Sequence, residues 1–260
     1  MRTRKRFGQH FLHDPAVIAR IVGAIAARPD EALVEIGPGP GTLTGPLLAA
    51  AGTLDVVEID RDLAADLQAR HGGDARFRLH TGDALQMDWT ALARERGRSL
   101  RVVGNLPYNI STPLLFQLLT HGAVIHDLSF MLQKEVVDRI VARPGSKSYG
   151  RLGVMLAPLC SATRLFDVGP GAFRPPPRVW SSVVQLRMHA SPPAWAQLPE
   201  YARVVTAAFG QRRKTLRNAL AGLLDASQIA ATGVDPAARA ETLTPEQFGA
   251  LAKAAASVLH

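Results

Sequence analysis

The sequence predicts an α/β fold in which a mainly parallel sheet, covered by helices on both faces, is followed by a small helical domain. Two observations support this prediction. Between residues 33 and 133, short apolar runs alternate with patterns of helical period, which is typical of parallel sheets with helical crossovers. Beyond residue 199 the short apolar runs stop and helical patterns continue. With 260 residues, 47% of them hydrophobic, the chain can bury a core of this size.

Five short apolar runs are expected to form the parallel strands. They are Leu33–Ile36, Leu54–Ile59, Phe77–His80, Leu100–Val103 and Leu128–Leu132. The segments near 41–51, 60–71, 112–121 and 134–143 have helical patterns and are expected to connect or follow these strands.

A proline-rich segment over residues 173–179 interrupts the alternation, because FRPPPRV suits neither a helix nor a central strand. Ser182–Met188 follows as a further strand, which we expect to be antiparallel. Residues 189–199 are the best candidate for a linker. We therefore expect two domains, residues 1–189 with the sheet and residues 190–260 with helices. In the second, Thr244 and Gln247 have the spacing of a capping box, which predicts a helix start.

The positive charge of the chain is concentrated in two segments. The whole chain carries +8, whereas residues 1–13 carry +4 and residues 168–224 carry +7. Such segregation is typical of proteins that bind a polyanion, although a solubilising surface is the alternative. A helical pattern with one apolar face is predicted over 205–223, and the basic residues beside that face are expected to reach phosphates. The expected RNA contacts are Arg4, Lys5, Arg6, Arg174, Arg178, Arg212, Arg213, Lys214 and Arg217.

Cysteine usage and hydropathy limit the class of protein. The single Cys160 excludes an internal disulfide and a multi-cysteine metal site, so we expect a cytoplasmic protein with a buried, inert thiol. His10 and His13 lack further ligands, and no metal is expected. No apolar stretch is long enough to span a membrane. The basic first residues are not followed by an apolar core, and we expect no targeting peptide.

A glycine-rich turn follows the first predicted strand and precedes a helix. Gly37, Gly39 and Gly41 would let the chain turn sharply and let a ligand approach main-chain N–H groups. Their spacing differs from the dinucleotide pattern, and no Gly-Lys-Ser/Thr follows as in a P-loop. Glu58 ends the second strand, where a carboxylate can accept ribose hydroxyls, and Asp83 follows the third, where it can accept from an adenine amine. Either acid alone is equally well explained as an ordinary strand-end cap.

The loop Asn105-Leu106-Pro107-Tyr108 follows the fourth predicted strand, at the sheet edge where α/β proteins bind their ligands. It offers an amide side chain, a carbonyl held by a rigid proline, and an aromatic face. That combination suits a flat base that carries an amino group.

This loop resembles the catalytic loop of methyltransferases that modify the exocyclic amine of adenine. The glycine turn with Glu58, Asp83 and Asn105 resembles the S-adenosylmethionine site of Rossmann-like methyltransferases. Residues 5–12, 173–183 and 209–218 resemble three further motifs of the ribosomal RNA adenine dimethyltransferases, in the family's order. The similarity is greatest to the bacterial branch that acts on 16S rRNA.

The resemblance implies a Rossmann-like methyltransferase domain and an RNA- or ribosome-binding helical domain at 190–260. It implies dimethylation of two adjacent adenosines in the 3′-terminal hairpin loop of 16S rRNA, within the small ribosomal subunit or its precursor. The cofactor contacts that it implies lie at His10, Leu12, Gly37, Gly39, Gly41, Glu58, Asp83 and Asn105. Many relatives have Asn at position 10, so a backbone contact is expected there. Trp180 stands where relatives are often acidic.

The chemistry of adenine gives the expected catalytic roles. The exocyclic nitrogen is a poor nucleophile because its lone pair is delocalised, so it needs acceptors that hold its hydrogens while it becomes tetrahedral. We expect the Asn105 side-chain oxygen and the Leu106 carbonyl to be those acceptors, with Pro107 fixing the carbonyl. Tyr108 is expected to stack on the base and Phe173 to close its other face. Packing under the loop is the alternative for Tyr108, and a core position is the alternative for Phe173.

Three other functions remain to be tested. A large-subunit rRNA adenine methylase of the resistance type would share the catalytic loop, and a ribosome-assembly factor would act mainly by binding. A nicotinamide-dependent dehydrogenase is disfavoured by the glycine spacing and by the lack of a catalytic proton donor. We expect a monomer.

Overall fold

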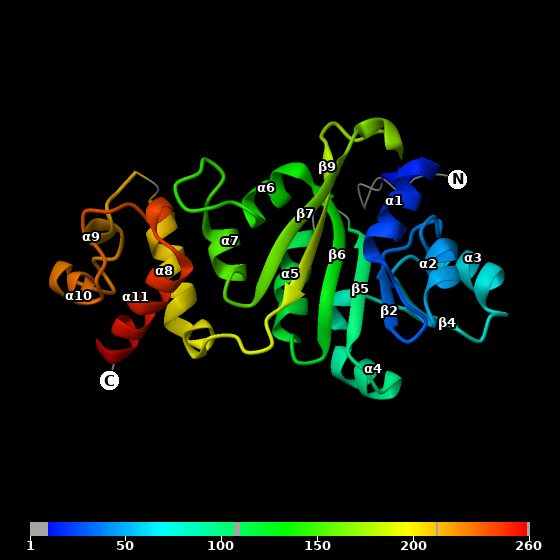
Figure 1. Cartoon of the computed structure of the whole chain (residues 1–260), viewed down its shortest axis with the longest axis horizontal. Helices are drawn as coiled ribbons and strands as arrows, with labels where there is room; N and C mark the ends of the chain where they lie inside the picture. Colours follow the sequence, from blue (N-terminus) through cyan, green and yellow to red (C-terminus); the bar gives the residue numbers. More distant parts are fainter. Residues whose placement is uncertain (1–9, 107–109, 212, 259–260) are drawn as a thin grey trace. The chain divides into compact units, whose positions relative to one another are not determined.

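The computed structural model describes residues 10–106, 110–211 and 213–258, which divide into two compact units (Figure 1). The first unit comprises the residues up to Val137 together with Ala162–Met188, and the second comprises Asp138–Ser161 together with the residues from His189 onward. Within the described ranges, no helix has the length and apolar character needed to cross a membrane.

The elements of the chain follow the α/β order that the sequence predicts. The first part contains β1 (Phe11–Leu12), α1 (Pro15–Ile25), β2 (Ala32–Ile36), α2 (Thr44–Ala50), β3 (Thr53–Glu58), α3 (Arg61–His71), β4 (Phe77–Thr81), η2 (Ala84–Gln86), α4 (Trp89–Arg96), β5 (Leu100–Asn105), α5 (Ser111–Thr120), β6 (Ile125–Gln133) and α6 (Lys134–Ile140). There follow α7 (Arg151–Leu156), β7 (Cys160–Val168), η3 (Pro170–Ala172), β8 (Phe173–Arg174), β9 (Ser181–Met188), η4 (Ala194–Gln197), α8 (Pro199–Gly210), α9 (Leu216–Ala219), α10 (Ala226–Ala231), η5 (Ala240–Thr242) and α11 (Pro245–Val258).

Seven strands form the main sheet, in the order β4-β3-β2-β5-β6-β9-β7. The strands from β4 to β6 are parallel, and β9 runs antiparallel to β6. The five predicted parallel strands and the predicted antiparallel strand are therefore confirmed. Strand β7 and the small antiparallel pair of β1 with β8 were not predicted from the sequence. The chain order reverses between β2 and β5, which is the position where open α/β sheets bind ligands.

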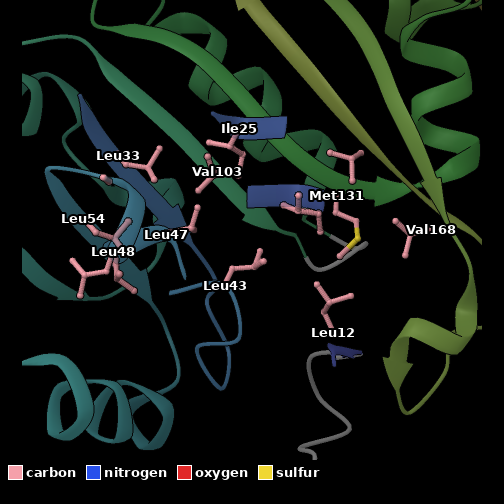
Figure 2. Close-up of a cluster of buried hydrophobic side chains, with 14 of the residues drawn as sticks. Leu12, Ile25, Leu33, Leu43, Leu47, Leu48, Leu54, Val103, Met131 and Val168 are labelled. Atoms are coloured by element: carbon pink, nitrogen blue, oxygen red, sulfur yellow. The ribbon is translucent and has the colours of Figure 1, made fainter. Parts of the chain in front are cut away.

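Both faces of the central strands β2, β3 and β5 are buried. On one face, strand residues such as Leu33, Leu54 and Val103 form a single cluster with side chains of α1, α2 and α3 (Figure 2). The residues that alternate with these, such as Val34 and Val102, are buried as well, so the opposite face is also covered. This arrangement holds the carboxyl ends of the parallel strands in fixed positions.

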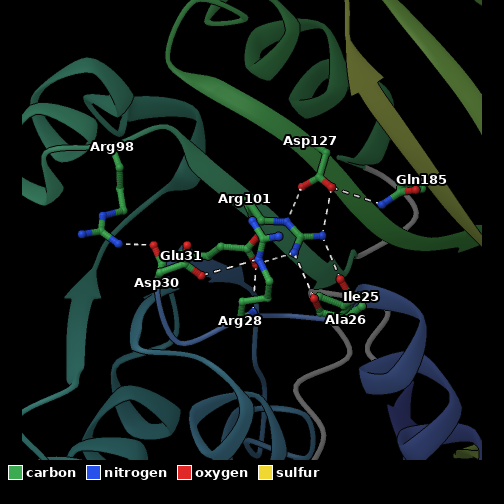
Figure 3. A network of polar contacts seen from close by, with 9 residues as sticks. All are labelled: Ile25, Ala26, Arg28, Asp30, Glu31, Arg98, Arg101, Asp127 and Gln185. Atoms are coloured by element: carbon green, nitrogen blue, oxygen red, sulfur yellow. Dashed lines mark hydrogen bonds and ion pairs between the residues drawn. The ribbon is translucent and has the colours of Figure 1, made fainter.

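A buried ionic network joins the sheet to the end of α1, at the amino ends of β5 and β6 (Figure 3). The Arg101 guanidinium donates to both oxygens of Asp127, at 2.9 and 3.0 Å, and to Glu31 Oε2 at 2.6 Å. It also donates to the Ile25 carbonyl at 2.8 Å, near the last turn of α1. The helix end therefore receives a positive charge, which its dipole favours.

The second unit has its own core, to which Tyr149, Val154, Tyr201 and Phe248 belong. The predicted capping box of α11 is confirmed, because the Thr244 N–H donates to Gln247 Oε1 at 2.8 Å and the Gln247 N–H to Thr244 Oγ1 at 3.3 Å.

The second unit differs from the sequence prediction in two respects. The chain passes from the first unit to the second between Met188 and His189, and residues 138–161 cluster with the C-terminal helices rather than with the sheet. The Tyr149 hydroxyl donates to the Leu243 carbonyl, and the Tyr201 hydroxyl to the Val154 carbonyl, both at 2.7 Å. The continuous helix expected over 205–223 is wrong: α8 ends at Gly210, and α9 begins at Leu216, whose N–H donates to the Ala238 carbonyl.

Candidate active site

The glycine turn after β2 has the backbone geometry that its sequence predicts. Gly37, Gly39 and Gly41 have φ angles of 62°, 57° and 80°, in the left-handed region that side chains other than glycine rarely adopt. The turn is held to the neighbouring strand by the Gly37 N–H, which donates to the Val57 carbonyl at 2.9 Å. An Arg70 guanidinium N–H from α3 donates to the Pro40 carbonyl at 2.8 Å.

Glu58 lies at the carboxyl end of β3, directly beside this turn. Its two oxygens accept from the Gly39 N–H at 3.1 Å and from the Asp60 N–H at 2.9 Å. The side chain is buried, and this burial raises its pKa above the ordinary value. The turn and a hydrogen-bond acceptor for hydroxyl groups therefore meet at one point of the sheet edge.

A second buried carboxylate, Glu35, lies in β2 just before the turn. It accepts a 2.7 Å hydrogen bond from the Thr44 hydroxyl at the start of α2. Burial is the main cause that raises the pKa of Glu35 to about 7, and the neighbouring Glu58 carboxylate adds to the effect. Glu35 thus stabilises the glycine turn by linking β2, which precedes the turn, to α2, which follows it.

Asp83 follows β4 and caps a short 3-10 turn, because one of its oxygens accepts from the Leu85 N–H at 2.9 Å. The Gly82 N–H donates to the Glu58 carbonyl, which places this loop beside the end of β3. Ile59 is 52% exposed and Leu85 is 36% exposed, although most large apolar side chains are buried. The carboxylates of Glu58 and Asp83 and the exposed apolar side chains of Ile59 and Leu85 thus lie at or just after the carboxyl ends of the adjacent strands β3 and β4.

Asn105 ends β5, next to β2 in the sheet. Its amide nitrogen donates to the His10 carbonyl at 3.3 Å, which orients the amide and leaves its oxygen outside this hydrogen bond. Gly104 is tightly packed, since an added Cβ would lie 2.5 Å from the Ile36 carbonyl oxygen. The Leu106 N–H donates to the Met131 carbonyl at 3.3 Å, and this fixes the start of the loop that follows β5.

Strands β1 and β8 come from the beginning and from the last part of the first unit, and they pair beside this edge of the sheet. The Phe11 ring packs on Gly39, where an added Cβ would lie 3.1 Å from a ring carbon. The His10 Nδ1 lies 2.8 Å from the Pro175 carbonyl oxygen and, since a carbonyl only accepts, Nδ1 donates. Leu12 pairs with Phe173, and both are buried. Phe173 is only 2% exposed, so its ring has no open face for a base in this structure and is a core residue here.

The predicted cofactor residues are thus brought together around the ends of β2 to β5, with His10 and Leu12 beside them. Of the predicted RNA-binding residues, Arg174 and Arg178 are exposed in the first unit, and Arg213, Lys214 and Arg217 are exposed in the second. Pro107, Tyr108, Arg4, Lys5, Arg6 and Arg212 lie outside the described residues. Among the residues that the structure does describe, no group of three or more His, Cys, Asp or Glu side chains is placed to hold a metal ion.

Sequence reasoning missed five residues that shape this site. Gly104 and Arg70 act through packing or through backbone hydrogen bonds, which no local pattern signals. Phe11 lies within the motif at residues 5–12, but its packing on Gly39 was not predicted. Ile59 and Leu85 carry a weak signal, because each is an apolar residue next to or near a predicted acidic contact.

Comparison with known proteins points to one family. A family model described as ribosomal RNA adenine dimethylase matches residues 1–257. The proteins named ribosomal RNA small subunit methyltransferase A from Methylococcus capsulatus and Pseudomonas aeruginosa are each 54% identical to this chain. They cover 96% of this chain, with 96% and 94% of their own lengths.

Solved structures show the same fold. The 23S rRNA methyltransferase ErmE is 27% identical, with a TM-score of 0.73 over 94% of this chain and 98% of its own. A dimethyladenosine transferase from Plasmodium falciparum is 24% identical, with a TM-score of 0.78 over 93% of this chain and 96% of its own.

Proposed function

The chain belongs to the ribosomal RNA adenine dimethylase family, and we therefore propose that it dimethylates the N6 amines of two adjacent adenosines in 16S rRNA. The target is the 3′-terminal hairpin loop, in the small ribosomal subunit or its precursor. S-adenosylmethionine is the methyl donor. The protein acts as a monomer in the cytoplasm, and its helical segment 190–260 contributes RNA or ribosome contacts.

The groups at the sheet edge fit S-adenosylmethionine. Glycines with positive φ leave room for a ligand against the main chain after β2. Glu58 supplies a carboxylate for ribose hydroxyls, and Asp83 supplies one for the adenine amine of the cofactor. Ile59 and Leu85 supply exposed apolar contacts for its flat base. When bound, this cofactor supplies an electrophilic methyl group.

Asn105 has the central role toward the substrate amine. Its amide nitrogen is occupied by the His10 carbonyl, so the oxygen is the end directed to accept a hydrogen from the adenine N6. The Leu106 carbonyl is the second acceptor, with Pro107 holding it in place. These acceptors favour the tetrahedral nitrogen that develops during attack, and they act by position rather than as strong bases. Tyr108 supports the base by stacking.

The observation that carries the proposal is this link between Asn105 and His10, beside the glycine turn. The test is to incubate the protein with S-adenosylmethionine and with unmethylated small or large ribosomal subunits separately, and to map the modified nucleotides. We expect two adjacent dimethyladenosines in small subunits only. Asn105→Ala should abolish methyl transfer while small-subunit binding, measured by sedimentation, stays within a few-fold.

The likeness to ErmE supports a second candidate, a methylase of 23S rRNA. Modification confined to large subunits would establish that function and overturn the first. The two proteins from Methylococcus and Pseudomonas, at twice the sequence identity, favour the small subunit.

A further inference from the structure

The connection between β8 and β9 exposes a tryptophan near the candidate site. Trp180 is 55% exposed and Val179 is 44% exposed. By contrast, Trp89 is fully buried and Trp195 packs against the core of the second unit. More than half of the area of this aromatic side chain is left uncovered by the protein, so packing within the protein does not fully explain it.

The structure holds this tryptophan in place rather than leaving it on a loose loop. Its six-membered ring lies on Gly169, where an added Cβ would be 3.7 Å from a ring carbon. Its carbonyl accepts a 2.9 Å hydrogen bond from the Lys134 N–H at the start of α6. The ring is therefore fixed against a residue without a side chain, while more than half of its surface stays open to solvent.

The register of the sheet gives the position of Trp180 relative to the catalytic loop. Asn105 pairs with Met131, and Met131 pairs with Val183. Val183 is thus two strand spacings from Asn105, and Trp180 lies three residues further toward the same edge. With about 4.8 Å between strands and about 3.3 Å per residue, the two Cα atoms are on the order of 14 Å apart. At about 3.4 Å per stacked base, that distance corresponds to a few nucleotides.

The positive charge near Trp180 in the sequence complements the negative charge of a nucleic acid. Arg174 ends β8, Arg178 lies in the connection that follows it, and both are exposed. Among the residues that the structure describes, neither guanidinium has a carboxylate partner at ion-pair distance. An open aromatic face with arginines beside it is the arrangement that binds single-stranded nucleic acids, where bases stack and cations contact phosphates.

We propose that Trp180 is a stacking platform for an unpaired nucleotide of the substrate RNA, a few nucleotides from the target adenosine. Arg174 and Arg178 contact the phosphates that flank this nucleotide. The role is in substrate binding, not in the chemical step, and it rests on the proposed function of the site.

The test compares Trp180→Ala, Trp180→Phe and Trp180→Leu with Val179→Ala, a control that removes the exposed neighbour without an aromatic face. Methyl transfer to unmethylated small subunits is measured at varied particle and S-adenosylmethionine concentrations. Stacking is worth about 1–3 kcal/mol per base, which corresponds to about 5- to 150-fold in affinity. Trp180→Ala and Trp180→Leu should raise the KM for particles by that factor, with kcat and the KM for S-adenosylmethionine unchanged. Trp180→Phe and Val179→Ala should stay within about threefold.

A second measurement separates RNA from a ribosomal protein as the partner. A protein-free fragment of 16S rRNA with the 3′-terminal hairpin should quench the emission of the wild type, and Trp180→Phe should remove this part of the quenching. Three results would overturn the proposal: Trp180→Ala equal to Val179→Ala, full affinity in Trp180→Leu, or a loss seen with particles but not with protein-free RNA. Failure of the wild type to methylate small subunits would refute the proposed function instead, while quenching by RNA would still test Trp180.

Discussion

Removal of Arg101 should destabilise the first unit severely, because its guanidinium is the main partner of a buried carboxylate. Asp127 is almost fully buried and accepts two hydrogen bonds from Arg101. In Arg101→Met it would keep only the Gln185 amide, at 3.1 Å. Breaking a buried pair in this way costs about 3–5 kcal/mol. The variant also loses the donor to the Ile25 carbonyl at the end of α1.

That cost is large compared with the free energy of unfolding of a typical domain, which is about 5–15 kcal/mol. The assay is urea unfolding followed by circular dichroism, with hydrogen exchange of peptides from β5 and β6 to assign the loss to the first unit. Arg78→Met is the matched control, because its ion pair with Glu95 is exposed on both sides, at 43% and 54%. This control should lose less than about 1 kcal/mol.

A double variant checks the physical cause. Arg101→Met combined with Asp127→Leu removes both charges, and it should recover much of the lost stability because no unpaired carboxylate remains. The reasoning is refuted if Arg101→Met unfolds at the same urea concentration as Arg78→Met, or if the double variant is no more stable than Arg101→Met alone.

Three further predictions concern single residues. Because burial raises the pKa of Glu35 to about 7 from an ordinary 4.5, the unfolded chain ionises first, and stability should fall by up to about 3 kcal/mol as pH rises between these values. Glu35→Gln should not show this loss. The prediction is contradicted if the urea midpoints of the wild type and the variant change by the same amount between pH 5 and pH 8. Gly104→Ala should cost about 1–3 kcal/mol and weaken S-adenosylmethionine binding in calorimetry, because its Cβ meets the Ile36 carbonyl; an unchanged urea midpoint argues against this. Burial raises the pKa of the Cys160 thiol to about 12, so iodoacetamide should label it only in urea, and rapid labelling of the native protein at pH 8 would be the contrary result.

The parallel sheet could be predicted because its strands are continuous apolar runs, and the site edge could be predicted because polar residues follow those runs. Strand β7 was missed because exposed and buried residues alternate irregularly along it. The β1–β8 pair contains two residues per strand, which is too short for any periodic signal. The link between Asn105 and His10 spans 95 residues, and no local pattern encodes such a contact.

The placement of residues 138–161 could not be predicted for a similar reason. Their partners in the second unit are side chains and carbonyls more than 40 residues away, such as Val154 with Tyr201. Helix α8 ends earlier than its apolar period suggests, because the following segment is anchored to residues 236–238 by backbone hydrogen bonds. In both cases tertiary contacts override the local pattern.

The two units are interleaved along the chain, and this has a consequence for synthesis on the ribosome. The sheet acquires β9 between β6 and β7 only after Met188 has been made, so the pairing of the seven strands is completed late. Residues 138–161 leave the ribosome before their partners and must wait for α8 and α11 with Tyr149 and Val154 uncovered. A nascent chain therefore completes the first unit only after Met188 and the second unit only when synthesis is almost finished. For the same reason a gene split at codon 189 would not yield two fragments that fold independently.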